Sequence, residues 1–316
     1  MEDTVKIAFA THALRGYPQR KGGVPAEDRR RNLFRWMQRH GFDGMEVGDW
    51  WFDFYAAKNE EIVQLAAELG EFGLELVGLN CLRKCVTHPA VAEKNRDDLR
   101  RAVEVAAAVN ARFVNVSLSL VPSVSGVTED RIKGLQVSPG GGKGASEAEF
   151  ADAAGFLRAL AEEAAGAGIG VAIELHHCSL ADTSQRILHI LELANHPNLS
   201  VNPDLANLYW GYEVPEEPWH RAVEQLAGRV KIWHLKNVQR IHVPETQRAV
   251  FVHASLDEGD IDYRWALARL IEAGFDGYLS LEGAGPGDLL AFAARGKAYL
   301  DTLLGEHKSG LGLRVH

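Results

Sequence analysis

Short apolar runs alternate along this chain with longer segments of mixed polarity. The runs are rich in β-branched and aliphatic residues and have the length of buried strands. In chain order they are VKIAFA (5–10), GMEVG (44–48), LELVGLN (74–80), ARFVNVSLS (111–119), GVAIELH (170–176), NLSVNPD (198–204), VKIWHLK (230–236) and GYLSLEG (277–283). Strands that alternate with helix-length segments are typical of βα units in a parallel sheet.

The segments between these runs have the period of amphipathic helices. In the first, Leu33, Trp36, Met37 and His40 follow the i, i+3, i+4, i+7 spacing that turns one stripe toward a sheet. Gly41 then ends the predicted helix, and a glycine recurs between helix and strand further along the chain. Eight such units predict an α/β fold, a closed (β/α)8 TIM barrel. A doubly wound open sheet is the alternative, but its glycine-rich dinucleotide turn is missing after the first strand.

Length and composition fit one large domain. The chain has 316 residues and is 46% apolar, so we expect a single barrel domain over 1–316, with a core at 5–304 and a tail at 305–316. Two long insertions, 121–150 and 237–260, follow the fourth and seventh strands, on the side of a barrel where active sites form. We expect the first to be a mobile lid or a docking loop, or else an insertion without a role.

Charge and hydropathy restrict the partners. A net charge of −9 argues against nucleic acid binding through a basic face. The chain has no apolar run of membrane-spanning length, and its first residues do not resemble a signal peptide, so we expect a cytoplasmic protein. With three cysteines, a disulfide framework is not expected.

A polar residue stands at the end of each of the last four strand-like runs: Glu174, Asp204, His234 and Glu282. Parallel barrel strands bring such ends to one rim. Counting back by two places small or polar residues on the inner face and apolar residues under the helices. Three carboxylates and an imidazole favour a divalent cation such as Mn²⁺ or Mg²⁺ over a structural zinc. The sequence therefore predicts one metal site at this rim.

The chain resembles the xylose isomerase-like barrel superfamily, which contains sugar isomerases and epimerases and also endonuclease IV. The resemblance spans about residues 5–304. It rests on GFDGMEVG, IELHH, VNPDLAN, KIWHLKN, LDEGDIDY and GFDGYLSLEG, in that order.

The resemblance implies one divalent cation, Mn²⁺ foremost and otherwise Mg²⁺ or Co²⁺, at Glu174, Asp204, His234 and Glu282. It also implies that Glu174 and Glu282 exchange a substrate proton across an enediolate. One position departs from the family pattern, because Asn207 stands where many members have a histidine. That departure puts the standard epimerase mechanism in question, although an amide can still bind a hydroxyl.

His176 is a further catalytic candidate, since it should face inward two residues beyond Glu174. Its unperturbed pKa suits a general base at neutral pH, although it could equally bond a loop carbonyl. Five residues are candidates for substrate binding: Glu46, Asn80, Asn207, Lys236 and Trp50. Three of them have an alternative interpretation without substrate contact. Glu46 could form an ion pair on the barrel floor, Lys236 could lie exposed on the rim, and Trp50 could belong to a self-buried aromatic loop or a subunit contact.

These candidates leave several functions open. We expect a metal-dependent isomerase or epimerase that acts on a sugar or polyol carbonyl. The first alternative is a lyase of the same superfamily, either an inosose dehydratase or a C-glycoside deglycosidase subunit acting on 3-keto glycosides. Acidity and Asn207 count against an endonuclease IV-like nuclease, and the full ligand set counts against a barrel that only binds a partner. We expect a homo-oligomer, or a hetero-oligomer with a small second subunit that completes the pocket.

Overall fold

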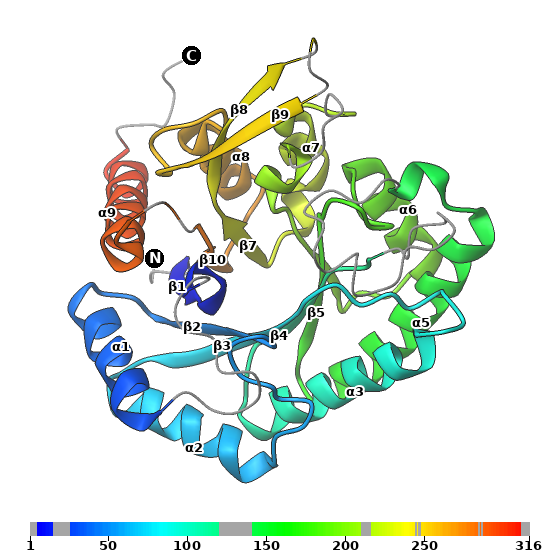
Figure 1. Ribbon diagram of the computed structural model, residues 1–316, viewed down its shortest axis with the longest axis horizontal. Helices are drawn as coiled ribbons and strands as arrows, with labels where there is room; N and C mark the ends of the chain where they lie inside the picture. Colours follow the sequence, from blue (N-terminus) through cyan, green and yellow to red (C-terminus); the bar gives the residue numbers. More distant parts are fainter. Residues whose placement is uncertain are drawn as a thin grey trace.

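The computed structural model of the protein describes residues 5–14, 26–119, 141–209, 216–243, 245, 248–283, 285 and 287–310. Within them an eight-stranded parallel sheet curls into a barrel with helices around its outside (Figure 1). The predicted TIM barrel is confirmed. The barrel strands are β1 (Lys6–Ala10), β2 (Gly44–Gly48), β3 (Glu75–Cys81), β4 (Phe113–Val116), β5 (Gly170–Glu174), β6 (Leu199–Asn202), β7 (Ile232–Leu235) and β10 (Tyr278–Leu281).

The strand order is β6-β5-β4-β3-β2-β1-β10-β7. The two outer strands of this order meet only through an isolated parallel bridge between Val201 and Val230, so the barrel is nearly closed. Each predicted strand is present, although the run 111–119 contributes only Phe113–Val116 to the ladder. At the rim of the barrel the chain leaves the hydrogen-bonded sheet, so the apolar run in the sequence is longer than the strand.

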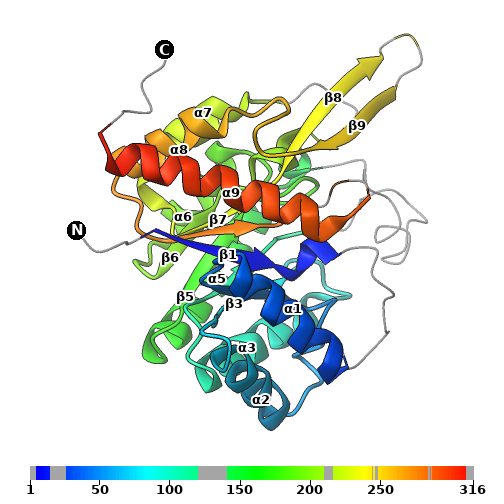
Figure 2. The same ribbon diagram turned by 90° about the vertical axis from the view of Figure 1, so that its left-hand side faces the viewer.

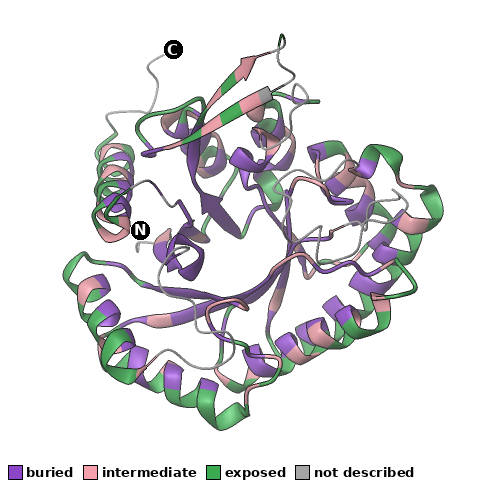
Figure 3. Cartoon of the chain, in the orientation of Figure 1, coloured by how far each residue is buried: buried purple, intermediate pink, exposed green. Residues whose placement is uncertain are grey.

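Helices cover the outside of the sheet. They are α1 (Glu27–Arg39), α2 (Asn59–Gly70), α3 (Ala92–Ala108), α5 (Glu147–Gly166), α6 (Ser184–Ala194), α7 (Trp219–Leu226), α8 (Tyr263–Glu272) and α9 (Leu289–Lys308). Short 3₁₀ turns are η1 (Thr11–Leu14), η2 (Gly142–Gly144), η3 (Leu205–Tyr209) and η4 (Ala227–Arg229). Figure 3 shows the buried faces of the helices turned toward the strands. Of the predicted stripe in α1, Leu33 and Met37 are buried, Trp36 is half-buried and His40 is exposed. Burial of a side chain such as Leu33 stabilises the fold by about 1.5–3 kcal/mol.

The buried apolar side chains form two clusters on opposite faces of the barrel wall. The larger one lies between strands and helices and contains Val171, Ile173 and Leu279. The smaller one fills the barrel interior and contains Ala172 and Ile232. The predicted inward and outward registers are thus confirmed. Above this small apolar floor the interior carries polar side chains, and these form the candidate site.

The insertion 237–260 is an element that the sequence analysis did not predict. Strands β8 (Asn237–Val243) and β9 (Arg248–Ala254) pair antiparallel, with Ile241 opposite Val250. The hairpin projects from the barrel beyond β7 (Figure 2). Ile241 and Val250 are both exposed. The apolar residues of the hairpin therefore do not mark a buried face, and the sequence pattern did not predict it. Asn237 anchors its base by donating to the carbonyl oxygens of Leu256 and Ile261.

Other expectations concern the fourth-strand insertion and the C-terminus. The proposed lid or docking loop lies largely outside the described residues, and its described part forms η2 and the start of α5. Helix α9 continues to Lys308, so the first residues of the expected tail are helical, and 311–316 lie outside the described residues. Among the described helices, none combines the length and hydropathy that crossing a bilayer requires.

Candidate metal centre

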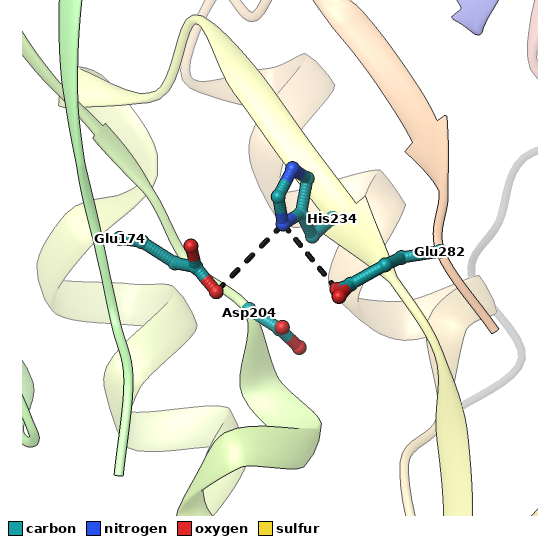
Figure 4. A group of neighbouring side chains, drawn as sticks. All are labelled: Glu174, Asp204, His234 and Glu282. Carbon is teal, nitrogen blue, oxygen red and sulfur yellow. Dashed lines mark ion pairs between the residues drawn. The ribbon is translucent and has the colours of Figure 1, made fainter. Parts of the chain in front are cut away.

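Four buried side chains converge at the carboxyl ends of the barrel strands. Glu174 is the last residue of β5, Asp204 follows β6, His234 lies in β7 and Glu282 follows β10. One ligand atom from each lies within 4.8 Å of the others. Figure 4 shows Glu174 and Glu282 on either side, with Asp204 and His234 between them. The structure therefore brings together the four residues that the sequence predicted as ligands.

His234 lies at the centre of these contacts. Its Nδ1 is 3.3 Å from Oε2 of Glu282 and 3.8 Å from Oε1 of Glu174. Its Nε2 donates to the carboxylate of Glu46, at 2.8 Å from Oε2 and 2.9 Å from Oε1. The backbone N–H of His234 donates to Oδ1 of Asn202 at 2.8 Å. The imidazole is thus held from three directions, with Nδ1 directed at the two glutamates.

Burial and mutual charge perturb the ionisation of this cluster. Burial lowers the pKa of His234, but the carboxylates of Glu46 and Glu282 raise it by more, to well above its usual value. Burial raises the pKa of Asp204 well above its usual value, assisted by the charges of Glu282 and Glu174. Burial opposes ionisation of Glu282 as well, yet Lys236 and His234 hold its pKa well below the usual range. Such clustered carboxylates require compensating positive charge.

The donor set fits a divalent cation. Oδ1 of Asp204 and Nδ1 of His234 are buried and have no hydrogen-bond partner within the described residues. Buried polar atoms are normally satisfied, so two such atoms in one cluster point to a missing partner. Three carboxylates and one imidazole nitrogen supply oxygen-rich coordination, which suits Mn²⁺ or Mg²⁺.

Lys236 directly follows β7 and reaches the cluster of predicted ligands. Its Nζ donates to Oδ2 of Asp204 and, at 2.9 Å, to Oε2 of Glu282. The ammonium is buried, contrary to the alternative of an exposed rim lysine. It therefore supplies positive charge directly beside two predicted ligands.

Side-chain amides hold Glu174 in place. Asn115 donates to Oε2 of Glu174 at 2.8 Å, and Asn207 donates to Oε1 at 3.2 Å. Asn207 also donates to Oδ2 of Asp204 at 2.8 Å. Its amide nitrogen thus donates to two of the predicted ligands, whereas its Oδ1 is buried without a partner among the described residues. A substrate contact by Asn207 stays a prediction, and it would have to use that oxygen.

The amides continue as a network across the barrel. Asn115 donates to Oδ1 of Asn80 at 3.0 Å and accepts from Asn202 at 3.1 Å. Nδ2 of Asn80 lies 3.3 Å from Nδ1 of His12. Asn80 is buried, and both its amide oxygen and its amide nitrogen have partners in this network. Its role in substrate binding stays a prediction.

Two of the candidate substrate residues lie near β2. Glu46 is completely buried and accepts from His234 and, at 2.5 Å, from the hydroxyl of Ser280. Its predicted role in substrate binding stays a prediction. Trp50 packs its indole against His12 with ring centroids 5.7 Å apart, and its Nε1 has no hydrogen-bond partner among the described residues. The adjoining Phe52 is buried, so this aromatic loop is in part self-packed.

His176 is buried at the rim beyond Glu174. Its Nδ1 donates to the carbonyl oxygen of His177 at 2.8 Å, and the two rings stack with centroids 4.3 Å apart. Since a carbonyl can only accept, Nδ1 carries the proton and Nε2 of the neutral ring is an acceptor. Burial and the nearby positive groups of His177, Lys236 and Arg83 lower the pKa of His176 well below its usual value. The ring is thus neutral at neutral pH.

His12 is the residue that sequence reasoning missed. It lies in η1 directly after β1, is buried, and contacts Asn80 and Trp50 beside the cluster. The motif ATH after the first strand has the same signal that identified the four ligands, a polar residue at a strand end. Applying that criterion to the first strand would have found it.

Comparison with known proteins agrees with this architecture. The family model for the xylose isomerase-like TIM barrel matches residues 34–303. A xylose isomerase-like TIM barrel protein from Mycobacterium smegmatis, solved in complex with magnesium, is 22% identical, with a TM-score of 0.78 over 95% of this chain and 96% of its own. Among curated proteins, none matches this sequence.

Two further solved structures are similar. L-ribulose 3-epimerase is 18% identical, with a TM-score of 0.70 over 99% of this chain and 98% of its own. The probable 3-DHS dehydratase AsbF from Bacillus anthracis is 17% identical, with a TM-score of 0.67 over 94% and 98%. At these identities the likeness concerns the fold.

The barrel and its strand-end cluster define the class of protein. This chain belongs to the xylose isomerase-like TIM barrel family, as the sequence motifs indicated. Structures of this fold include a sugar epimerase and a probable dehydratase.

Proposed function

We propose that this protein is a divalent-metal-dependent isomerase or epimerase acting on the carbonyl of a sugar or polyol. The observation that carries the proposal is the convergence of Glu174, Asp204, His234 and Glu282 within 4.8 Å. The resemblance to L-ribulose 3-epimerase and to a magnesium-bound barrel supports it. Mn²⁺ is the cation we propose, with Mg²⁺ or Co²⁺ as substitutes.

The four side chains would each supply one donor atom. A divalent cation bound there would polarise the substrate carbonyl and stabilise the negative charge of an enediolate. The protein contributes a dry, preorganised site, because all four residues are buried. Fixed charges act more strongly in such surroundings than in water.

Glu174 and Glu282 would carry the proton. They come from β5 and β10 and lie on opposite sides of the cluster (Figure 4). A flat enediolate between them would present one face to each carboxylate, so one glutamate removes the α-proton and the other returns it. The amides of Asn115 and Asn207 orient the first carboxylate, and Lys236 orients the second. This orientation supplies the close positioning that weak bases need.

Solvent exchange tests the proposal. The enzyme with Mn²⁺ should incorporate deuterium from D₂O at the carbon next to the carbonyl of a ketose substrate. Glu174→Gln and Glu282→Gln should each reduce incorporation by about 10²–10⁴-fold, because each removes an acid–base group. Glu75→Gln is the matched control, since Glu75 begins β3 at the other end of the barrel and pairs with Lys6. Undiminished exchange in both site variants would discard the mechanism.

One observation favours a second candidate, a lyase. His176 is a buried imidazole whose Nδ1 donates to the carbonyl oxygen of His177, so its Nε2 carries the lone pair that a general base needs for β-elimination next to a carbonyl. The likeness to a probable dehydratase supports the same reaction class. Incubation with 3-keto glycosides or inososes should then release elimination products. His176→Ala should abolish them, while His189→Ala, in α6 and paired with Glu147 outside the cluster, should not. Full activity of the first variant removes His176 from the reaction.

A further inference from the structure

The contact between Glu46 and His234 joins opposite parts of the barrel. Glu46 lies in β2 and His234 in β7, with β1 and β10 between them in the sheet. Both side chains are fully buried. Both carboxylate oxygens lie within 2.9 Å of Nε2. The contact therefore crosses the barrel interior and does not follow the strand ladder.

Small inward residues make room for this crossing. Ala8 of β1 and Ser280 of β10 pair with one another in the ladder, and Ser280 also pairs with His234. Neither carries a side chain that blocks the path. The Ser280 hydroxyl instead donates to Oε2 of Glu46 at 2.5 Å. Glu46 is thereby held on one side by Ser280 and on the other by the imidazole.

The chemistry of the pair decides which ring nitrogen carries a proton. An ionised carboxylate only accepts hydrogen bonds, so Nε2 must be the donor. A histidine that ligates a cation is neutral, and with its proton on Nε2 the lone pair is on Nδ1. Nδ1 is the nitrogen that faces Glu174 and Glu282, and it has no hydrogen-bond partner among the described residues.

We propose that Glu46 is a positioning residue that selects the Nε2–H tautomer of His234, so that Nδ1 serves as the nitrogen ligand of the cation. The inference rests on the proposed metal site and gives Glu46 a role other than the substrate contact expected from the sequence. Both carboxylate oxygens of Glu46 face the imidazole, and Oε2 also accepts from Ser280. A carboxylate behind a histidine ligand fixes the ring and raises its basicity, and loss of such a partner typically weakens metal binding about 10–100-fold.

Two substitutions separate the orienting role from bulk packing. Glu46→Leu fills the space but cannot accept the Nε2 proton. Glu46→Gln retains one acceptor oxygen, so it should preserve the tautomer while losing the charge. Ser280→Ala removes only the hydroxyl that holds Glu46. Glu217→Gln is the matched control, because Glu217 is a buried glutamate that accepts hydrogen bonds from Ser184, away from the strand-end cluster.

The experiment measures Mn²⁺ affinity and the histidine tautomer separately. Free Mn²⁺ is followed by electron paramagnetic resonance during titration, and ¹⁵N-labelled histidine spectra are recorded with Mg²⁺ bound. Circular dichroism confirms that each variant is folded. We expect Glu46→Leu to weaken Mn²⁺ binding about 10–100-fold and to lose the Nε2–H signature. Glu46→Gln should lose less affinity and keep the signature, Ser280→Ala should lose a few-fold, and Glu217→Gln should match the wild type.

The outcomes also distinguish this inference from the proposed function. If the wild type binds the metal and folded Glu46→Leu binds it equally well, the positioning role is wrong and the proposed function stands. If KM rises in both Glu46 variants with metal affinity unchanged, Glu46 binds substrate instead. A wild type that binds neither Mn²⁺ nor Mg²⁺ overturns the proposed function, and the inference with it.

Discussion

Asp49 is a carboxyl of intermediate burial outside the candidate site. It follows β2 and accepts hydrogen bonds from the hydroxyl of Tyr55 at 3.0 Å and from the backbone N–H of Leu82 at 3.1 Å. Lys84 is 3.9 Å away. These partners do not offset the loss of water, because burial raises the pKa of Asp49 from 3.8 to about 6. The residue joins the loop after β2 to the loop after β3.

The raised pKa predicts a specific pH dependence of stability. The folded protein binds the Asp49 proton more tightly than the unfolded chain, so this contribution is full at low pH and is lost as the pH rises through about 6. Between pH 5 and pH 7 the wild type should lose about 1 kcal/mol that Asp49→Asn does not lose. Urea unfolding of both proteins at the two pH values measures the difference. Asp28→Asn, at an exposed position in the first turn of α1 and away from Asp49, should behave as the wild type.

At the scale of elements, the start of β10 requires the chain to pass close to the backbone that leads into β7. Gly277 precedes β10, and a Cβ at this position would lie 1.9 Å from the backbone oxygen of Lys231, the residue before β7. Gly155 lies inside α5, where a Cβ would meet nothing within 4 Å. The two glycines have opposite consequences for stability although both lie in or beside regular structure.

Alanine substitution at the two positions should therefore have opposite signs. Gly277→Ala should destabilise the fold by about 1–3 kcal/mol, because the backbone has to move to admit the methyl group. Gly155→Ala should stabilise it by about 0.5–1 kcal/mol, because alanine loses less entropy in a helix. Thermal or urea unfolding gives both values. A shift of the same sign in both variants would contradict the steric argument.

The helix and strand pattern was readable from sequence where burial is one-sided. Leu33 and Met37 marked the buried stripe of α1. In β5, Ile173 marked the face under the helices and Ala172 the face toward the barrel interior. The β8–β9 hairpin was not readable in this way. Ile241 and Val250 are exposed in it, so its strands lack the alternation of buried and exposed residues that identifies a half-buried strand.

At the scale of the whole molecule, the metal site and the fold should be thermodynamically linked. The four proposed ligands come from β5, from β7 and from the residues after β6 and β10, so only the folded barrel assembles them. Mn²⁺ at about 100 times its Kd should stabilise the wild type by about 2.7 kcal/mol relative to EDTA-treated protein. Asp204→Asn should abolish this increment, whereas Asp97→Asn on the exposed face of α3 should retain it. Equal unfolding midpoints with and without the metal would argue against the site.

The sequence by itself determined the βα alternation, the inner and outer faces of the strands, and the strand ends that supply Glu174, Asp204, His234 and Glu282. Those features are local, because side-chain direction alternates along a strand and parallel strands end at one rim. Only the tertiary structure decided the contact between Glu46 and His234, the proximity of His12 and the amide network that holds Glu174. Glu46 and His234 are 188 residues apart and lie on strands that are not neighbours. Their contact depends on the closure of the barrel and the small residues inside it, and no periodicity along the chain encodes that geometry.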